Sequence, residues 1–253
     1  MRLDKRLHAV ASLVPQGSRF ADIGTDHAYL PVWLLEQGVI ASAVAGDIAA
    51  GPCQAARTTV AMHGAASSIA VRQGSGLAVL SPGEADCIAI CGMGGSTIIS
   101  ILAADMAVAK GAQRLLLQPM AGAAALRRWL VAQGWCITRE ALVDDEPHFY
   151  EIICAERAEK CAARASDAGE QCCSEQAGPT SYSEVEYLVG PALLRDGHPL
   201  LAKQIARQQA SLHELLTNMA RSERAKASTK YQEAQKLLQA LEALKLNLGK
   251  AEA

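Results

Sequence analysis

Aromatic residues and long hydrophobic runs are scarce in this sequence. Of its 253 residues only two are Phe, five are Tyr and three are Trp, although half are apolar, so we expect a core built mainly from small aliphatic side chains. No run reaches the roughly 18 apolar residues that a membrane-spanning helix needs. The charged start is not followed by the apolar segment of a secretory signal. We therefore expect a soluble, cytoplasmic protein with no membrane partner.

A strong charge of either sign is also missing, because the formal net charge is only −2. The balance is uneven along the chain. From Lys203 to Ala253 nine Lys and Arg face five Glu, a surplus of four, so residues 1–202 carry −6 by subtraction from −2. A polyanionic partner would therefore have to use local basic patches, above all in the tail.

Paired cysteines are absent as well. The eight cysteines follow no C-x-x-C framework of the kind that holds zinc. Most lie in or beside apolar runs, where free cysteine behaves as a small hydrophobic residue. We interpret Cys161, Cys172 and Cys173 as thiols of a loop-like insert, and we predict no metal site.

Strand-like and helix-like segments alternate from residue 18 to residue 133. The expected strands are 18–23, 42–47, 68–73, 86–91 and 114–118, and the expected helices are 27–37, 49–63, 96–104 and 121–133. An amphipathic helix over 3–14 precedes them. Such alternation predicts an α/β fold with a parallel sheet and right-handed crossovers.

Two further strand-like runs, 135–143 and 148–155, break this rhythm. Only four residues, 144–147, separate them, and strands joined by so short a connection pair antiparallel. Five alternating units followed by a terminal antiparallel hairpin is the order expected of a class I methyltransferase Rossmann-like sheet, whereas a nicotinamide-binding domain would end with another parallel unit.

The remaining chain has a different character. Residues 156–183 lack periodicity and read as a flexible insert. Residues 184–194 predict a short helix interrupted at Gly190-Pro191, and apolar residues then recur in helical steps over 201–219 and 237–248. We expect two helices folded into an antiparallel coiled-coil hairpin, with one long helix as the alternative. The predicted domains are therefore 1–155, the insert 156–183, and a helical region 184–253.

The first candidate site is the turn after the first strand. Asp22 and Gly24 end the strand, and Asp26 stands where the common pyrophosphate pattern has its middle glycine. A carboxylate there would repel phosphates and tolerates a cationic ligand. Asp47 ends the second strand, near the spacing at which an acid reaches ribose hydroxyls. A helix N-cap is the alternative role of Asp47.

Glycines follow the third and fourth strands. Gly74 and Ser75 lie where a cofactor's adenine ring would be flanked, although that signal alone is weak. Gly92–Gly95 has three glycines in four positions, which lets backbone approach a flat ring closely, so a target base could be held there. A plain strand-to-helix turn is the alternative.

Asp26 and His27 are the acid and imidazole placed side by side in the expected cleft, and they are our candidates for proton handling. A structural role is the alternative for His27. Arg127 and Arg128, and the basic residues of the tail, would suit phosphate contacts, and solvated faces explain them equally well.

Several of these motifs occur together, in order, in a known family. They are Ala21–Pro31, Ala45–Asp47 followed by Gly51-Pro52, Gly92–Gly95, Leu117–Pro119, Leu126–Leu130, Gly134-Trp135 and Phe149–Ile153. Over residues 2–155, and again around Gly190-Pro191 and in the helical tail, the sequence resembles the bacterial tRNA (adenine-N1)-methyltransferases that modify adenine 22. Ser75 stands where the family often has an acid, and Met120 stands where it often has an asparagine. The insert at 156–183 is unusual for that family.

The resemblance implies S-adenosyl-L-methionine as cofactor, N1 of a tRNA adenine as methyl acceptor, and a helical hairpin that engages the tRNA. The residues then expected at the site are Asp26 and His27 for catalysis; Asp22, Gly24, Asp47, Gly74, Ser75 and Gly92 for the cofactor; and Met93, Gly94, Gly95, Tyr29, Arg127, Lys203 and Arg207 for the substrate. A small-molecule methyltransferase and a non-catalytic cofactor-binding protein remain the alternatives. A monomer is our expectation, although the sequence does not determine the oligomeric state.

Overall fold

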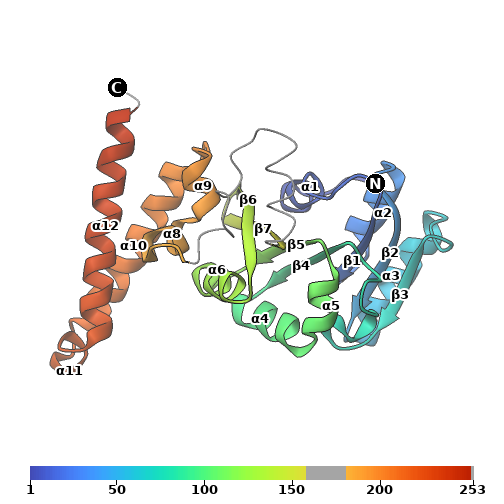
Figure 1. Cartoon of the computed structure of the whole chain (residues 1–253), viewed down its shortest axis with the longest axis horizontal. Helices are drawn as coiled ribbons and strands as arrows, with labels where there is room; N and C mark the ends of the chain where they lie inside the picture. The colour runs from blue at the N-terminus through green and yellow to red at the C-terminus, as the bar shows by residue number, and fades with distance from the viewer. Residues whose placement is uncertain (158–180, 252–253) are drawn as a thin grey trace. The chain divides into compact units, whose positions relative to one another are not determined.

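The computed structural model describes residues 1–157 and 181–251 (Figure 1). The chain divides into two compact units, Met1–Ser181 and Tyr182–Ala253. Residues 158–180 of the expected insert, with Cys161, Cys172 and Cys173, lie outside the described part. The predicted boundaries of the three regions stay a prediction.

A sheet of seven strands forms the first unit. The strands are β1 (Ser18–Ile23), β2 (Ile40–Asp47), β3 (Ile69–Gln73), β4 (Cys87–Met93), β5 (Arg114–Pro119), β6 (Trp135–Asp145) and β7 (His148–Arg157). Their order is β3-β2-β1-β4-β5-β7-β6. The first five strands pair parallel, and β7 pairs antiparallel with both β5 and β6. The predicted Rossmann-like sheet with a terminal antiparallel hairpin is thus confirmed.

Helices cover both faces of this sheet (Figure 1). The helices of the first unit are α1 (Lys5–Ala11), α2 (Tyr29–Glu36), α3 (Ala50–Met62), the 3₁₀ turn η1 (Gly76–Val79), α4 (Gly95–Ala104), α5 (Met106–Gly111) and α6 (Ala123–Ala132). The short helix α5 was not predicted, and its residues were left between the expected helix 96–104 and the next strand. The crossovers between parallel strands put helices on both sides, as the alternation requires.

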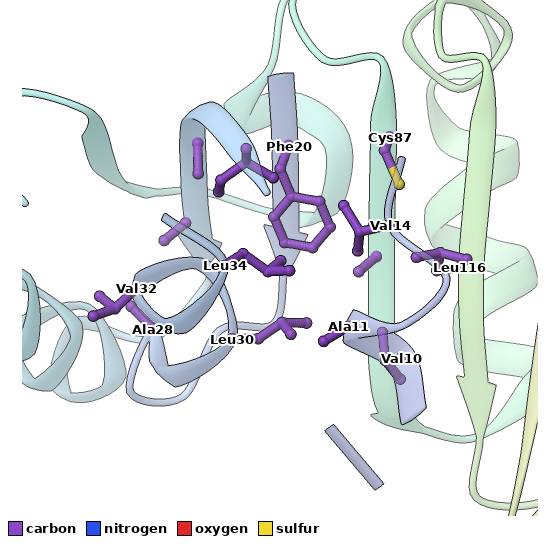
Figure 2. Close-up of a cluster of buried hydrophobic side chains, with 14 of the residues drawn as sticks. Val10, Ala11, Val14, Phe20, Ala28, Leu30, Val32, Leu34, Cys87 and Leu116 are labelled. Atoms are coloured by element: carbon purple, nitrogen blue, oxygen red, sulfur yellow. The ribbon is translucent and has the colours of Figure 1, made fainter. Parts of the chain in front are cut away.

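One layer of the core lies between the sheet and α1, α2 and α3. Phe20 of β1, Ala89 of β4 and Leu116 of β5 belong to it, together with Val10 of α1 and Leu34 of α2 (Figure 2). Side chains alternate between the two faces of a strand. The residues two positions further along β1, β4 and β5 therefore point to the same face as α1, at the carboxyl end of each strand.

The second unit contains five helices among the described residues: α8 (Glu184–Val189), α9 (Pro191–Arg195), α10 (Leu201–Met219), α11 (Glu223–Lys226) and α12 (Thr229–Ala251). Ser183 and Glu186 form a capping box at the start of α8. The helices α10 and α12 pack against each other, with Ile205 and Leu241 fully buried. Two long helices rather than one are therefore present, and α12 extends on both sides of the apolar repeat 237–248. A coiled-coil supercoil stays a prediction.

No helix in the described ranges 1–157 and 181–251 has the length and apolar character needed to cross a membrane.

Candidate active site

The turn between β1 and α2 is held in an unusual backbone conformation. Gly24 has φ +81° and Ala28 has φ 54°, a left-handed conformation that a residue with a side chain rarely adopts. The N–H groups of Gly24 and Thr25 both donate to the carbonyl of Gly46, at 2.8 and 3.0 Å. The turn is therefore tied to the end of β2, and its strain is typical of a ligand-binding loop.

Asp22 lies at the base of this turn and is buried. The pKa of its carboxyl group is raised to about 6, mainly by burial and slightly by the charge of Asp47, although a hydrogen bond from Thr25 and the positive charge of Arg6 lower it. The Thr25 hydroxyl is itself buried, next to this carboxyl group. This corner of the site therefore holds polar groups that a ligand can satisfy.

Asp26 and His27 stand at the rim of the same turn. The side chain of Asp26 is 76% exposed, and its Oδ2 lies 3.4 Å from His27 Nε2. The ring of His27 stacks on the ring of Tyr29, with 5.0 Å between centroids and 11° between planes. The structure thus brings together an acid, an imidazole and a phenol that the sequence placed within four positions, and leaves them accessible from solvent.

Asp47 and the turn after β3 form a second side of the site. Asp47 Oδ1 accepts a hydrogen bond from the Ala49 N–H at 2.7 Å, which orders the chain just before α3. The N-cap of α3 is Ala49, without a side-chain capping bond, so the alternative role of Asp47 as that N-cap is wrong. Gly74 donates its N–H to the Asp47 carbonyl at 2.9 Å. Ser75 precedes η1, and its side chain makes no capping bond there. Asp47, Gly74 and Ser75 are therefore neighbours at the ends of adjacent strands β2 and β3.

The glycine loop after β4 meets the first turn directly. A Cβ atom on Gly24 would lie 2.1 Å from Met93 Cε, which places the Met93 side chain against the Gly24 backbone. Gly92 has φ +75°, and Gly94 precedes the first residue of α4. A Cβ on Gly95 would come within 2.6 Å of the Gly122 carbonyl oxygen. Within the loop, Gly92 therefore needs glycine for its backbone conformation and Gly95 for close packing on the Gly122 backbone, while a Cβ on Gly94 would meet no close neighbour. The alternative of a plain strand-to-helix turn stays open.

Three residues at this edge were not assigned to the site from the sequence. Gln118 is fully buried at the end of β5, and its Oε1 accepts hydrogen bonds from Gly92 N–H and Arg6 Nη1, both at 3.1 Å. Met120 follows and is 53% exposed. A polar glutamine inside an apolar strand was the available signal for Gln118. Arg6 gave none, because one arginine on an amphipathic helix is ordinary.

Arg127 requires a correction. Its side chain is fully buried, with Nε 2.7 Å from Glu140 Oε1 and Nη2 2.7 Å from Glu151 Oε2. The two carboxylates raise the pKa of the guanidinium further despite its burial. An arginine held in this way inside the sheet unit does not reach a phosphate, so the structure speaks against the expected substrate contact.

Lys203 and Arg207 lie in the second unit. Both are exposed and stand four residues apart on α10, so their side chains share one face of the helix. Both side chains are therefore accessible enough to contact RNA phosphates.

The residues at the carboxyl edge of the sheet fit S-adenosyl-L-methionine. That molecule carries an ammonium, a sulfonium and two ribose hydroxyls, and the edge offers the carboxylates of Asp22 and Asp47 together with the buried Thr25 hydroxyl. A bound positive charge would favour the ionised form of Asp22. No group of three or more His, Cys, Asp or Glu that could hold a metal ion occurs within the described residues.

Comparisons with known proteins agree with this fold and this edge. A family model described as a methyltransferase domain matches residues 3–153. The chain is 36% identical to the tRNA (adenine(22)-N(1))-methyltransferase of Bacillus subtilis over 91% of this chain and 92% of that protein. This chain therefore belongs to the methyltransferase domain family.

Solved structures narrow the assignment. The m1A22 tRNA methyltransferase TrmK of B. subtilis superposes with a TM-score of 0.80 at 31% identity, covering 96% of this chain and 99% of that one. Sp1610 of Streptococcus pneumoniae, solved in complex with S-adenosyl-L-methionine, gives 0.78 at 31% identity, covering 96% and 100%. Within the methyltransferases, the chain is a member of the tRNA (adenine(22)-N1)-methyltransferase family.

Proposed function

We propose that this protein transfers a methyl group from S-adenosyl-L-methionine to N1 of adenine 22 in tRNA, the activity for which its B. subtilis relative is named. The observation that supports it best is the contact between Gly24 and Met93. It joins the turn that fits the cofactor to the glycine loop that would suit a flat base, so donor and acceptor would lie side by side.

The chemistry asks for alignment more than for a strong base. When bound, the cofactor would supply an electrophilic methyl group, to which the in-plane lone pair of adenine N1 would bond in line as the methyl C–S bond breaks and S-adenosyl-L-homocysteine leaves. Asp47 would orient the ribose hydroxyls, and Asp22 would face the positive part of the ligand. Asp26 stands at the exposed rim, where its carboxylate stabilises the cationic methylated base or accepts its proton. The stacked rings of His27 and Tyr29 offer a face for the base.

The acceptor must also be exposed. Adenine N1 is paired or stacked in folded RNA, so the nucleotide has to leave its stack to reach the loop Gly92–Gly95. Residues 1–202 carry a net charge of −6, which opposes a polyanion. Lys203, Arg207 and the other basic residues of the helical unit supply the attraction. We therefore propose tRNA as the partner of this protein and the cytoplasm as the place where it acts.

A small-molecule methyltransferase with the same core is not favoured. The similarity to the tRNA-modifying relative extends over 91% of the chain, beyond the catalytic sheet and into the helical unit.

The direct test incubates the purified protein with labelled cofactor and unmodified bacterial tRNA, then maps the methylated nucleoside. We expect N1-methyladenosine at position 22. Asp26→Ala should abolish methyl transfer and leave cofactor affinity within about twofold, whereas Asp47→Ala should lose cofactor affinity, since a ribose hydrogen-bond pair to a charged group is worth about 1.5–3 kcal/mol. Equal loss of cofactor binding in both variants would contradict these roles.

A further inference from the structure

Arg6 lies on the N-terminal helix α1 and has no part in the proposed roles of the cofactor and base residues. Helix α1 packs on the sheet through Val10 and Ala11, both buried (Figure 2). Arg6 lies one turn before Val10, so it sits over the carboxyl edge of the strands rather than over the core.

Four strands present a polar or aromatic side chain to that place. Asp22 follows Phe20 by two positions on β1, Cys91 follows Ala89 on β4, and Gln118 follows Leu116 on β5, so all three point to the face that α1 covers. Tyr150 of β7 packs against the same core layer. The alternation of the sheet thus gathers these groups under one guanidinium.

The contacts of Arg6 are specific. Its Nη1 donates to Gln118 Oε1 at 3.1 Å, and its Cζ lies 5.6 Å from the centre of the Tyr150 ring, within the range of a cation–π contact. Asp4 Oδ2 lies 3.6 Å from Nη2. The guanidinium is therefore oriented by three neighbours, and only 21% of its side chain is exposed.

Gln118 connects Arg6 to the glycine loop through hydrogen bonds. The same Oε1 that accepts from Arg6 also accepts the Gly92 N–H at 3.1 Å, while Nε2 donates to the Pro119 carbonyl at 3.2 Å. Gly92 has φ +75° and no side chain of its own to fix it. The amide of Gln118 consequently links the two loops, after β4 and after β5, that flank the place of the base.

We propose that Arg6 is a positioning residue for methyl transfer: it fixes the amide of Gln118, and through it the loop Gly92–Gly95, in the geometry that receives the base. Arg6 also places a positive charge near Asp22, whose other charged or titratable neighbours are Asp47 of β2 and Cys91 of β4. A role in methyl transfer rests on the proposed function, whereas ordering of the loop does not.

The first test needs no substrate. Amide hydrogen exchange of the cofactor-free protein is compared for wild type, Arg6→Ala and Lys5→Ala. Lys5→Ala is the matched control, since it removes one positive charge from the same helix, and the ion pair of Lys5 with Asp145 is exposed. Exchange in the peptide containing Gly92–Gly95 should become about tenfold faster in Arg6→Ala and stay within about twofold in Lys5→Ala. Unchanged exchange in Arg6→Ala would overturn the proposal.

The second test is kinetic. Arg6→Ala should lower kcat by roughly 10- to 100-fold, the loss expected when the reacting groups are misplaced, with the KM for tRNA within about threefold. Because Arg6 acts through Gln118, the double variant Arg6→Ala/Gln118→Ala should be no slower than Gln118→Ala by more than about twofold. If the losses of kcat in the two single variants multiply in the double variant, Arg6 does not act through Gln118 and the proposal is overturned. Arg6→Lys keeps the positive charge and can still donate a hydrogen bond to Gln118, so its kcat should recover toward that of the wild type. A folded Arg6→Lys protein with a kcat no higher than that of Arg6→Ala would contradict the proposal.

A pH profile separates positioning from simple stability. Loss of Arg6 raises the pKa of Asp22, so the acidic limb of cofactor binding should move up by about one pH unit in Arg6→Ala and stay in place in Arg6→Lys. A limb at the same pH in all three proteins would overturn the electrostatic part. If the wild type methylated no tRNA, the proposed function would fail, but the exchange experiment would still decide the role of Arg6.

Discussion

Charged side chains are used differently in the two units. In Met1–Ser181 the guanidinium groups of Arg114 and Arg127 are buried against carboxylates, and Asp22 is buried as well. In Tyr182–Ala253 the only buried side chain with an amide or a charge is Gln204, as far as the described residues go. The charges of the sheet unit should thus affect folding and pKa values, and those of the helical unit should affect association with a polyanion and its dependence on salt.

The largest effect should come from breaking the buried network of the sheet unit. Arg127→Met leaves the carboxylates of Glu140 and Glu151 without their buried cation, so the free energy of unfolding should fall by about 4 kcal/mol. Urea denaturation measures it. Arg57→Met is the control, because Arg57 is exposed on α3 and its replacement should cost less than about 0.5 kcal/mol. An equally stable Arg127→Met protein would show that the network adds no stability.

The helical unit should instead respond to apolar burial. Leu241 of α12 is fully buried, and Leu241→Ala should cost roughly 3 kcal/mol of that unit's stability through lost packing. Leu246→Ala on the same helix is the control, since Leu246 is 67% exposed. Thermal unfolding followed by helical circular dichroism, with cofactor affinity measured alongside, checks the effect. A drop in cofactor affinity after Leu241→Ala would mean that the two units are not independent.

Replacing Asp22 should raise the free energy of unfolding of the cofactor-free protein, whereas the two preceding substitutions lower it. Its pKa is raised from 3.8 to about 6 in the folded protein, so the folded state holds the proton more tightly than the unfolded state. The stability that this proton contributes is lost as pH rises through about 6. Asp22→Asn should therefore stabilise the cofactor-free protein by about 3 kcal/mol at pH 8, with little gain at pH 4, while weakening cofactor binding. Unfolding curves at the two pH values test this, and a variant less stable at pH 8 would refute it.

The smallest effect should come from the exposed basic residues of α10. Lys203→Ala with Arg207→Ala should raise the KM for tRNA about tenfold at low salt and reduce the slope of log affinity against log salt by about two. Affinity for the cofactor and the free energy of unfolding should stay unchanged. Arg57→Ala with Lys110→Ala removes two exposed charges from the sheet unit as the control. An equal loss of tRNA affinity in that control would place the RNA contact elsewhere.

The sheet was predictable because its signals are local. Alternating apolar strands and helices, and the short link at 144–147, were enough to specify the parallel sheet and its hairpin. The acid, imidazole and glycine positions at the strand ends followed from the same topology, because the carboxyl ends of parallel strands meet at one edge.

Other features depend on partners distant in the sequence. Arg127 and Arg128 look alike as adjacent letters, and only the packing of α6 on the hairpin brings Glu140 and Glu151 to the first of them. Likewise, Arg6 and Gln118 are 112 positions apart. No periodicity or turn signal encodes such a pair, so both were missed as parts of a network.

The close glycine contacts at Gly24 and at Gly95 place different limits on how this sequence can vary. The obstacle at Gly24 is the tip of a flexible side chain, Met93 Cε, whereas the obstacle at Gly95 is the backbone oxygen of Gly122. A smaller residue at 93 removes the first clash but not the strain that φ +81° imposes on any side chain at 24, so a library of paired variants should show only partial rescue of substitutions at 24. No substitution removes a carbonyl oxygen, so selection for activity should return glycine alone at position 95, whatever else is randomised around it.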